Sequence, residues 1–131
     1  MSYLIVPSYR YVFLVCEDDM TLAEITTAWR EVQDALAGMR KKRVLVDVTA
    51  LKSSLEIKEL FDLAKILWRD FPESGRIALV IRWDQARFAK LLEMLVRTVG
   101  LYLTAFVSGD QAEAWILEEA KSMQPLEEFA K

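Results

Sequence analysis

The sequence predicts a single-domain α/β fold with a mixed, mostly parallel sheet of about five strands and four crossover helices. Three observations support this fold. After two N-terminal strand-like runs, amphipathic helical segments alternate with short apolar strands, which is the order of a parallel sheet with helical crossovers. The 131 residues are 53% hydrophobic and 28% charged, a globular composition that is large enough for one core. No linker or repeat divides the chain, so residues 1–131 are expected to form one domain, with a loosely held C-terminal tail over 123–131.

Two strands are expected at the N-terminus, over residues 3–6 and 10–16, with Pro7 between them. The second run carries apolar residues on both faces, which is typical of an interior strand. The acidic residues 17–19 end this run and are interpreted as a solvated turn.

Two capping boxes predict the first two helix starts. Thr21 and Glu24 have the spacing in which a hydroxyl and a carboxylate cap a helix reciprocally, and Ser53 and Glu56 repeat it. A strand over 44–49, apolar enough to be buried, lies between the two helices. Helical spacing also predicts a buried stripe on the second helix, made up of Ile57, Leu60, Phe61, Ala64, Leu67 and Trp68.

The second half of the chain continues the same alternation. A strand is expected over 77–81, followed by a helix that Asp84 caps. A further strand over 101–107 precedes a last helix that begins at Asp110. The helix–strand order therefore extends to the end of the predicted domain.

The residue inventory excludes the common catalytic sites. The chain has no histidine, so a Ser-His-Asp relay and a His-ligated metal site are both impossible. Its four glycines are scattered, which excludes the dinucleotide fingerprint and the phosphate-binding P-loop. We therefore predict no enzyme activity, no catalytic residue, no bound metal and no cofactor.

Net charge and cysteine content restrict the classes of partner and the cellular compartment that we expect. The net charge of −3 gives no reason to expect nucleic acid as a partner. The basic run Arg40–Arg43 falls where a helix is expected to end, and we interpret it as complementing the helix dipole rather than as a binding patch. Cys16 is the single cysteine and is expected to be a small buried apolar residue in a reducing setting. With no basic leader and no membrane span in the sequence, the expected location is the cytoplasm.

Two stretches of the chain match a known pattern. One is the strand 43–49, whose Asp47 precedes the loop to the second helix. The other is 105–116, a strand, turn and helix that ends in an Ala-Trp-aliphatic step. In these stretches, and in the order of its elements over nearly the whole chain, the protein resembles the STAS domains of sulfate transporters and anti-sigma-factor antagonists. The greater likeness is to the stand-alone, SpoIIAA-like bacterial proteins of that superfamily.

The same resemblance implies a signalling role that phosphorylation controls. In signalling members, a partner kinase phosphorylates a serine or threonine at the start of the second helix, and the phosphate switches the protein between partners. The corresponding residues here are Ser53 and Ser54, with Lys52 where the family typically has aspartate and Leu55 where it has glycine. From the residues alone, one serine is expected to cap the helix, which leaves the other open to modification.

Polar and aromatic residues near the carboxyl ends of the strands complete the candidate site. Asp47 is expected either to hydrogen-bond the adjacent loop backbone, and so to order residues 51–54, or to anchor a partner. Arg82 and Trp83 follow a strand and either form part of a protein interface or cover the sheet edge. The candidate partner-binding residues are Asp47, Leu51, Lys52, Arg82, Trp83 and Arg87.

These expectations lead to three hypotheses. The leading one is a non-enzymatic regulatory module that binds another protein, such as a kinase or a sigma-regulating factor, through its second helix, the loop 51–54 and its third helix. A homodimer is also expected, because the apolar content is high for a small chain. The alternative is a small-ligand or lipid carrier with a pocket lined by Leu91 and Leu95. The third is an enzyme of unknown type.

Overall fold

Five strands form one sheet in the computed structural model, which describes residues 2–71 and 75–118. The strands are β1 (Tyr3–Pro7), β2 (Val12–Asp18), β3 (Arg43–Leu51), β4 (Arg76–Val80) and β5 (Tyr102–Phe106). The helices are α1 (Leu22–Leu36), α2 (Ile57–Asp70), α3 (Ala86–Arg97) and α4 (Gly109–Ile116), with a 3₁₀ turn at Trp83–Gln85. The tail expected over residues 123–131 lies outside the described residues.

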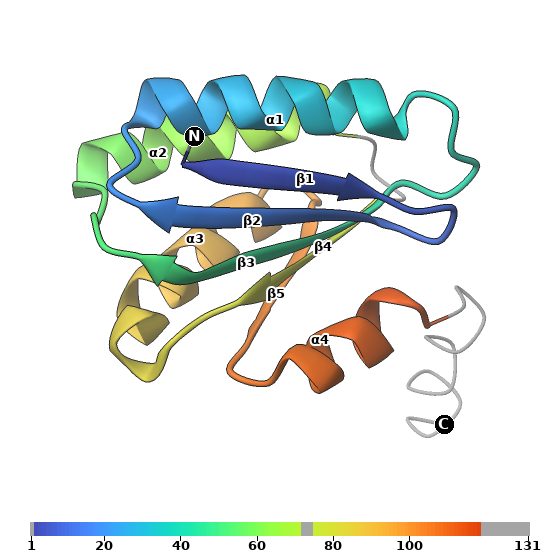
Figure 1. Ribbon diagram of the computed structural model, residues 1–131. Helices are drawn as coiled ribbons and strands as arrows, with labels where there is room; N and C mark the ends of the chain where they lie inside the picture. The colour runs from blue at the N-terminus through green and yellow to red at the C-terminus, as the bar shows by residue number, and fades with distance from the viewer. Residues whose placement is uncertain (1, 72–74, 119–131) are drawn as a thin grey trace, which may run out of the picture.

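The strands are ordered β1-β2-β3-β4-β5 across the sheet. β1 runs antiparallel to β2, and the other neighbouring strands are parallel. Helices α1, α2 and α3 connect successive parallel strands and pack on one face, whereas α4 follows β5 and lies on the other face (Figure 1). The predicted α/β fold with a mixed, mostly parallel sheet is confirmed, and β2 and β4 are interior strands as expected.

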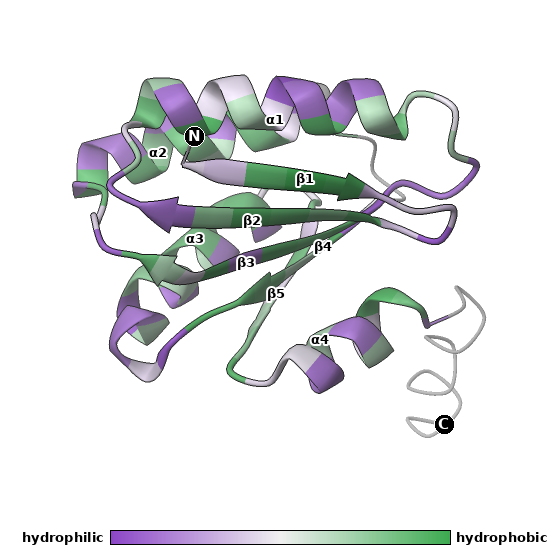
Figure 2. Ribbon diagram, viewed as in Figure 1, coloured by the Kyte–Doolittle hydropathy of each residue, from purple (hydrophilic) through white to green (hydrophobic). Residues whose placement is uncertain are grey.

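Side chains of the sheet alternate between two hydrophobic cores. Val44 and Val46 of β3 point into the larger core, which the sheet forms with α1, α2 and α3. Leu45 points to the opposite face and joins a smaller core with Ala112 and Ile116 of α4. Figure 2 shows most strands as hydrophobic and the helices as alternating between hydrophilic and hydrophobic residues. This alternation is expected where only one side of a helix is buried.

The capping box predicted at Thr21 is confirmed at the start of α1. The Thr21 hydroxyl accepts a hydrogen bond from the backbone N–H of Glu24 at 3.2 Å. The backbone N–H of Thr21 donates to the Glu24 carboxylate at 3.3 Å, so both halves of the box are formed.

The capping box predicted at Ser53 is wrong. α2 begins at Ile57, and its N-cap is Glu56, whose backbone N–H donates to the Glu59 carboxylate at 3.0 Å. The Ser53 hydroxyl bonds to another loop, and Leu55 packs against the larger core, so the chain stays extended for several residues longer than predicted. The serine pair therefore precedes the helix and does not begin it.

The cap predicted at Asp84 is also wrong. Asp84 lies within the 3₁₀ turn, and α3 begins after it, at Ala86. The Asp84 carboxylate accepts hydrogen bonds from Arg82 and is therefore not available as a helix cap. α4 begins one residue earlier than predicted, because the Ser108 hydroxyl caps it and accepts from the backbone N–H of Gln111 at 3.3 Å.

Candidate functional site

Most of the predicted site residues lie at the carboxyl edge of the sheet, where β3 and β4 end. This is the edge at which ligands and partners usually dock on α/β folds. A groove of about 290 Å³ lies there, which we call the edge groove. Its walls are formed by Val48, Leu51, Lys52, Ser53, Ser54, Arg82, Asp84, Gln85 and Phe88. The structure thus brings both predicted serines together with three of the predicted partner-binding residues.

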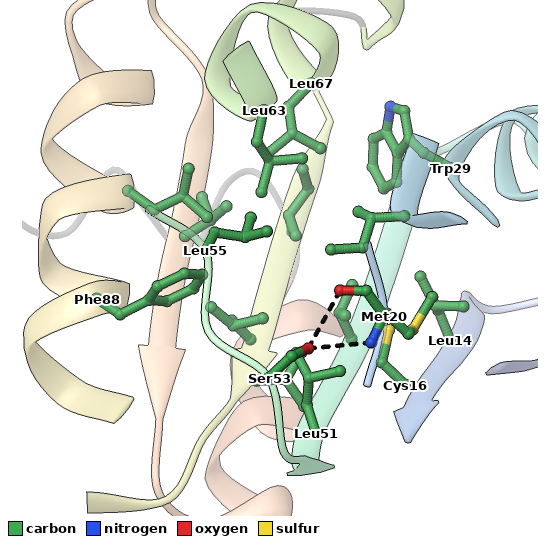
Figure 3. A pocket seen from close by; sticks show the side chains of 17 residues that line it. Leu14, Cys16, Met20, Trp29, Leu51, Ser53, Leu55, Leu63, Leu67 and Phe88 are labelled. Carbon is green, nitrogen blue, oxygen red and sulfur yellow. Dashed lines mark hydrogen bonds between the residues drawn. The ribbon is translucent and has the colours of Figure 1, made fainter. Parts of the chain in front are cut away.

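Ser53 ties the loop before α2 to the loop before α1. Its hydroxyl accepts a hydrogen bond from the backbone N–H of Met20 at 3.0 Å and donates to the Met20 carbonyl at 3.1 Å (Figure 3). The backbone N–H of Lys52 donates to the carbonyl of Asp18 at 2.8 Å, next to this pair. The Ser53 hydroxyl is therefore engaged in holding the wall of the edge groove in place.

Ser54 differs from its neighbour in both exposure and contacts. Its side chain is exposed on the wall of the edge groove. Within the described ranges, its hydroxyl has no hydrogen-bond partner. Of the two serines, Ser54 is therefore the one that an enzyme can reach without breaking a contact of the fold.

Arg82 clamps the ends of two strands together. One of its terminal nitrogens donates to the carbonyl of Leu51 at 3.0 Å and also to the carbonyl of Thr49. Its Nε donates to the Asp84 carboxylate at 2.9 Å, and this hydrogen bond lowers the pKa of Asp84. The side-chain amide of Gln85 adds a bond to the Val48 carbonyl at 2.8 Å. Asp84 balances the charge of the guanidinium group. The Arg82 side chain forms part of one wall of the edge groove.

The loop-ordering role expected of Asp47 is wrong. Its carboxylate accepts hydrogen bonds from the backbone N–H of Thr49 at 2.8 Å and from the Thr49 hydroxyl at 2.6 Å, both within β3. Asp47 lies two positions after Leu45 and so shares the sheet face that carries α4. The loop 51–54 is ordered instead by Ser53 and by Arg82, as described above.

Trp83 and Arg87 do not line the edge groove. The Trp83 side chain is 79% exposed. It borders a neighbouring hollow of about 310 Å³, to which Lys90 and Phe106 also belong. Arg87 is exposed and lines neither space. The predicted partner-binding residues therefore spread over the surface around the 3₁₀ turn, and their role in binding stays a prediction.

An apolar cavity of about 80 Å³ lies inside the larger core, next to the edge groove. Apolar side chains surround it from the sheet and from α1, α2 and α3 (Figure 3). Val48, Leu51, Ser53 and Phe88 line both the cavity and the edge groove. The carboxyl edge therefore has an apolar interior behind a polar mouth.

This cavity differs from the pocket that the sequence suggested. The expectation that Leu91 and Leu95 line a ligand pocket is wrong, because α3 contributes Phe88 and Leu92 to the walls. Cys16 is buried as predicted and also lines the cavity, and burial raises the pKa of its thiol to about 12. The thiol is therefore protonated at neutral pH and is a poor nucleophile.

An exposed apolar stripe runs along α2. Ile57, Phe61 and Trp68 are 66%, 48% and 53% exposed, and their spacing places them on one side of the helix. The expectation that they belong to the buried stripe is wrong, because Leu60 and Leu67 occupy the buried side. Apolar residues of α2 cover roughly 220° of the helix at 100° per residue, more than the sheet can bury. The width of this apolar arc is the sequence signal that predicts the exposed stripe.

Comparison with known proteins supports the fold. No family model and no curated protein matches this chain. A crystal structure of an uncharacterized protein of the DUF3478 family from Shewanella loihica PV-4, described as having a SpoIIAA-like fold, is similar to it with a TM-score of 0.61. The match covers 87% of this chain and 91% of the other, at 18% sequence identity. The protein has a SpoIIAA-like fold.

The function of this SpoIIAA-like chain has to be argued from its own residues, because 18% identity establishes the fold alone. Over residues 2–71 and 75–118, no group of three or more Cys, Asp or Glu side chains is placed to hold a metal ion. No helix in those ranges has the length and apolar content needed to cross a membrane. The SpoIIAA-like fold here presents a groove and an apolar cavity at its carboxyl edge and an exposed stripe along α2, all of which suit noncovalent binding.

Proposed function

We propose that this protein is a non-enzymatic regulatory module that binds another protein through α2, the loop before it and α3. The exposed stripe of Ile57, Phe61 and Trp68 carries the proposal, because large apolar side chains gathered on one side of a helix are typical of a docking surface. The stripe begins directly after the loop that forms the edge groove. Aromatic anchors such as Phe61 and Trp68 often supply most of the affinity of a protein interface.

Charges beside the stripe favour a partner with an acidic rim. Lys58 and Lys65 are exposed and lie seven positions apart, on one side of the stripe. Trp83 and Arg87 are also exposed, in the 3₁₀ turn and at the start of α3. The resemblance to anti-sigma-factor antagonists favours a kinase or a sigma-regulating factor as the partner. The proposed setting is the reducing cytoplasm, where the single Cys16 stays a free thiol.

Phosphorylation of Ser54 is the proposed control. The Ser54 hydroxyl is exposed on the wall of the edge groove, whereas the Ser53 hydroxyl is engaged with Met20. A phosphate adds about two negative charges, which would repel the acidic rim of the partner. Lys52 on the same wall would hold the phosphate in the groove. We therefore expect phosphorylation to release the partner.

A pull-down from a lysate of the source organism, followed by titration with the purified partner, tests the docking surface. The test variant is Phe61→Asp, and the matched control is Leu4→Asp, because Leu4 is 59% exposed on β1. We expect the control to bind like the wild type and Phe61→Asp to bind about 30-fold more weakly, the effect of losing an anchor worth about 2 kcal/mol. Equal binding by the two variants would reject the stripe as the docking surface.

Separate variants test the control and the oligomeric state. Ser54→Asp should weaken partner binding, and Ser54→Ala should leave it unchanged. Light scattering of the wild type and of Phe61→Asp shows whether a second copy of the chain occupies the stripe. If the wild type is a dimer and Phe61→Asp is a monomer, the partner that occupies the stripe is a second copy of the chain.

The apolar cavity favours a second function, that of a carrier for a small apolar ligand. Its 80 Å³ is about half the volume of an engineered cavity of about 150 Å³ that binds benzene, so the occupant would be the end of an apolar chain. Lys52 and Arg82 at the mouth suit a polar head group. Native mass spectrometry of the wild type and of Leu92→Phe, which narrows the cavity, tests this function. A bound mass that the variant loses supports a carrier, and the bare chain mass in both spectra argues against one.

A further inference from the structure

A second candidate site lies at the opposite, amino edge of the sheet. The β1–β2 turn, the loop between α1 and β3, and the end of α4 meet there, at the right-hand end of the strands in Figure 1. Figure 2 shows strongly hydrophilic residues in part of the turn and in the part of the loop that leads into β3. Between them is a space of about 260 Å³, which we call the basic hollow. Its walls are Tyr9, Arg10, Arg40, Lys41, Arg43 and Leu117.

The four basic residues over 40–43 do not all interact with the dipole of α1. α1 ends at Leu36 and carries no basic residue in its last turn. Lys42 reaches back to the helix, and its ammonium group donates to the Leu36 carbonyl. Arg43 instead donates to the carbonyl of Glu118, after α4, at 3.0 Å. The predicted dipole role therefore fits Lys42 and does not account for the rest of the run.

The basic hollow concentrates positive charge on an acidic protein. Four cationic side chains line it, although the chain carries a net charge of −3. Among the described residues, no carboxylate lines the hollow, and the side chains of Arg10 and Arg40 form no hydrogen bond or ion pair. Like charges that share one space repel each other, so an anion bound among them would relieve that repulsion.

We propose that the basic hollow binds a soluble small molecule that carries two linked phosphate groups. The paired N–H donors of a guanidinium match phosphate oxygens, and Arg10, Arg40 and Arg43 approach the hollow from separate segments. One phosphate carries at most about two negative charges, so the three guanidinium groups favour two linked phosphates over one. The hollow of 260 Å³ is several times the volume of about 30 Å³ that a water molecule occupies. Tyr9, which is 92% exposed on the wall, offers a further hydroxyl donor.

Calorimetric titration with inorganic pyrophosphate, in magnesium-free buffer at low ionic strength, tests the proposal. The test variant is Arg10→Gln/Arg40→Gln. The matched control, Arg30→Gln/Arg97→Gln, removes two exposed arginines from α1 and α3. Each lost charge-assisted contact should weaken binding about tenfold or more. The affinity of the test variant for pyrophosphate should therefore be about 100-fold lower than that of the wild type, and the affinity of the control should be unchanged. Added salt should weaken the binding of the wild type.

Two further measurements locate the site and the source of the phosphate. Pyrophosphate should shift the NMR signals of the Arg10 and Arg40 amides, and circular dichroism should show the same fold in every variant. Sedimentation with vesicles that contain phosphatidic acid separates a lipid headgroup from a soluble ligand. Equal pyrophosphate affinities in the test and control variants would overturn the proposal. So would binding to the vesicles without binding to pyrophosphate.

Discussion

The Ser53 hydroxyl is hydrogen-bonded to both backbone polar groups of Met20, which lies 33 positions earlier in the chain. Through this pair, the loop that precedes α2 is fixed to the loop that precedes α1. The adjacent Ser54 makes no such contact among the described residues. Two neighbouring serines therefore have different roles, one within the fold and one at the surface.

Removing the two hydroxyls should have unequal effects on stability. Ser53→Ala should lower the free energy of unfolding by about 1–3 kcal/mol, because it leaves the part-buried N–H and carbonyl of Met20 without their partner. Ser54→Ala should change it by less than about 0.5 kcal/mol, as is usual for exposed positions. Urea unfolding followed by tryptophan fluorescence measures both values. Equal losses would show that the pair with Met20 does not hold the loop.

Arg82 should matter to stability more than its exposed neighbour Arg87. Arg82→Gln removes the hydrogen bonds to the carbonyls of Thr49 and Leu51 and should cost about 1–3 kcal/mol. Arg87→Gln, the matched loss of charge on an exposed side chain, should stay within about 0.5 kcal/mol. Thermal unfolding of both variants is the measurement. A Tm for Arg82→Gln that equals that of Arg87→Gln would show that the clamp is dispensable.

The buried thiol of Cys16 should make stability depend on alkaline pH. Burial raises its pKa from 9.0 to about 12, so between these values the folded chain keeps a proton that the unfolded chain has lost. The unfolded state then binds fewer protons, and the free energy of unfolding falls as the pH rises. Tyr11 acts in the same direction, because its hydrogen bond to Glu113 raises its pKa to about 12.

The variant Cys16→Ala isolates this effect. It removes the titrating thiol and leaves Tyr11 in place, so its stability should fall less steeply than that of the wild type between pH 9 and pH 12. Chemical unfolding at a series of pH values gives both slopes. Parallel curves would mean that the thiol ionises alike in the folded and unfolded chains.

Arg76 should hold α4 on the sheet. Its guanidinium donates to the carbonyls of Trp115 and Glu118, both at 2.9 Å, and lies 5.5 Å from the centre of the Trp115 ring. Arg76→Met keeps most of the stem and should cost about 2–3 kcal/mol through the lost charge-assisted bonds. Hydrogen exchange should speed up in α4 first, while the amides of α2 remain protected. This role would be contradicted if exchange sped up equally in α2 and α4. It would also be contradicted if exchange in α4 were no faster than in an Arg97→Met control.

The order of the elements could be predicted from the sequence because apolar periodicity reports burial directly. Helix starts were harder to predict, since a capping motif does not show whether its polar group has another partner. Thr21 caps α1 as predicted. By contrast, Ser53 bonds to Met20, and Asp84 bonds to Arg82. Contacts between residues distant in the chain, or between neighbouring side chains, decided these two cases.

The position of the candidate site could be predicted from the sequence, but only some of the residues that form its walls could be. Strand ends in the sequence placed Leu51, Lys52 and Arg82 near the carboxyl edge, where they line one groove. The apolar cavity has no signal of its own in the sequence, because the residue types that line it also fill a solid core. The exposure of Phe61 likewise depends on how far the sheet covers α2, and periodicity gives only the width of the apolar arc.

Strand β3 joins the two edges of the sheet. It begins at Arg43, a wall of the basic hollow, and ends at Leu51, a wall of the edge groove. Eight steps of about 3.3 Å separate its first and last residues, so these walls are about 26 Å apart. Occupants of the two spaces would not collide, so one molecule can hold both at once. If both proposals hold, the anion site and the groove beside the docking surface lie at opposite ends of one strand.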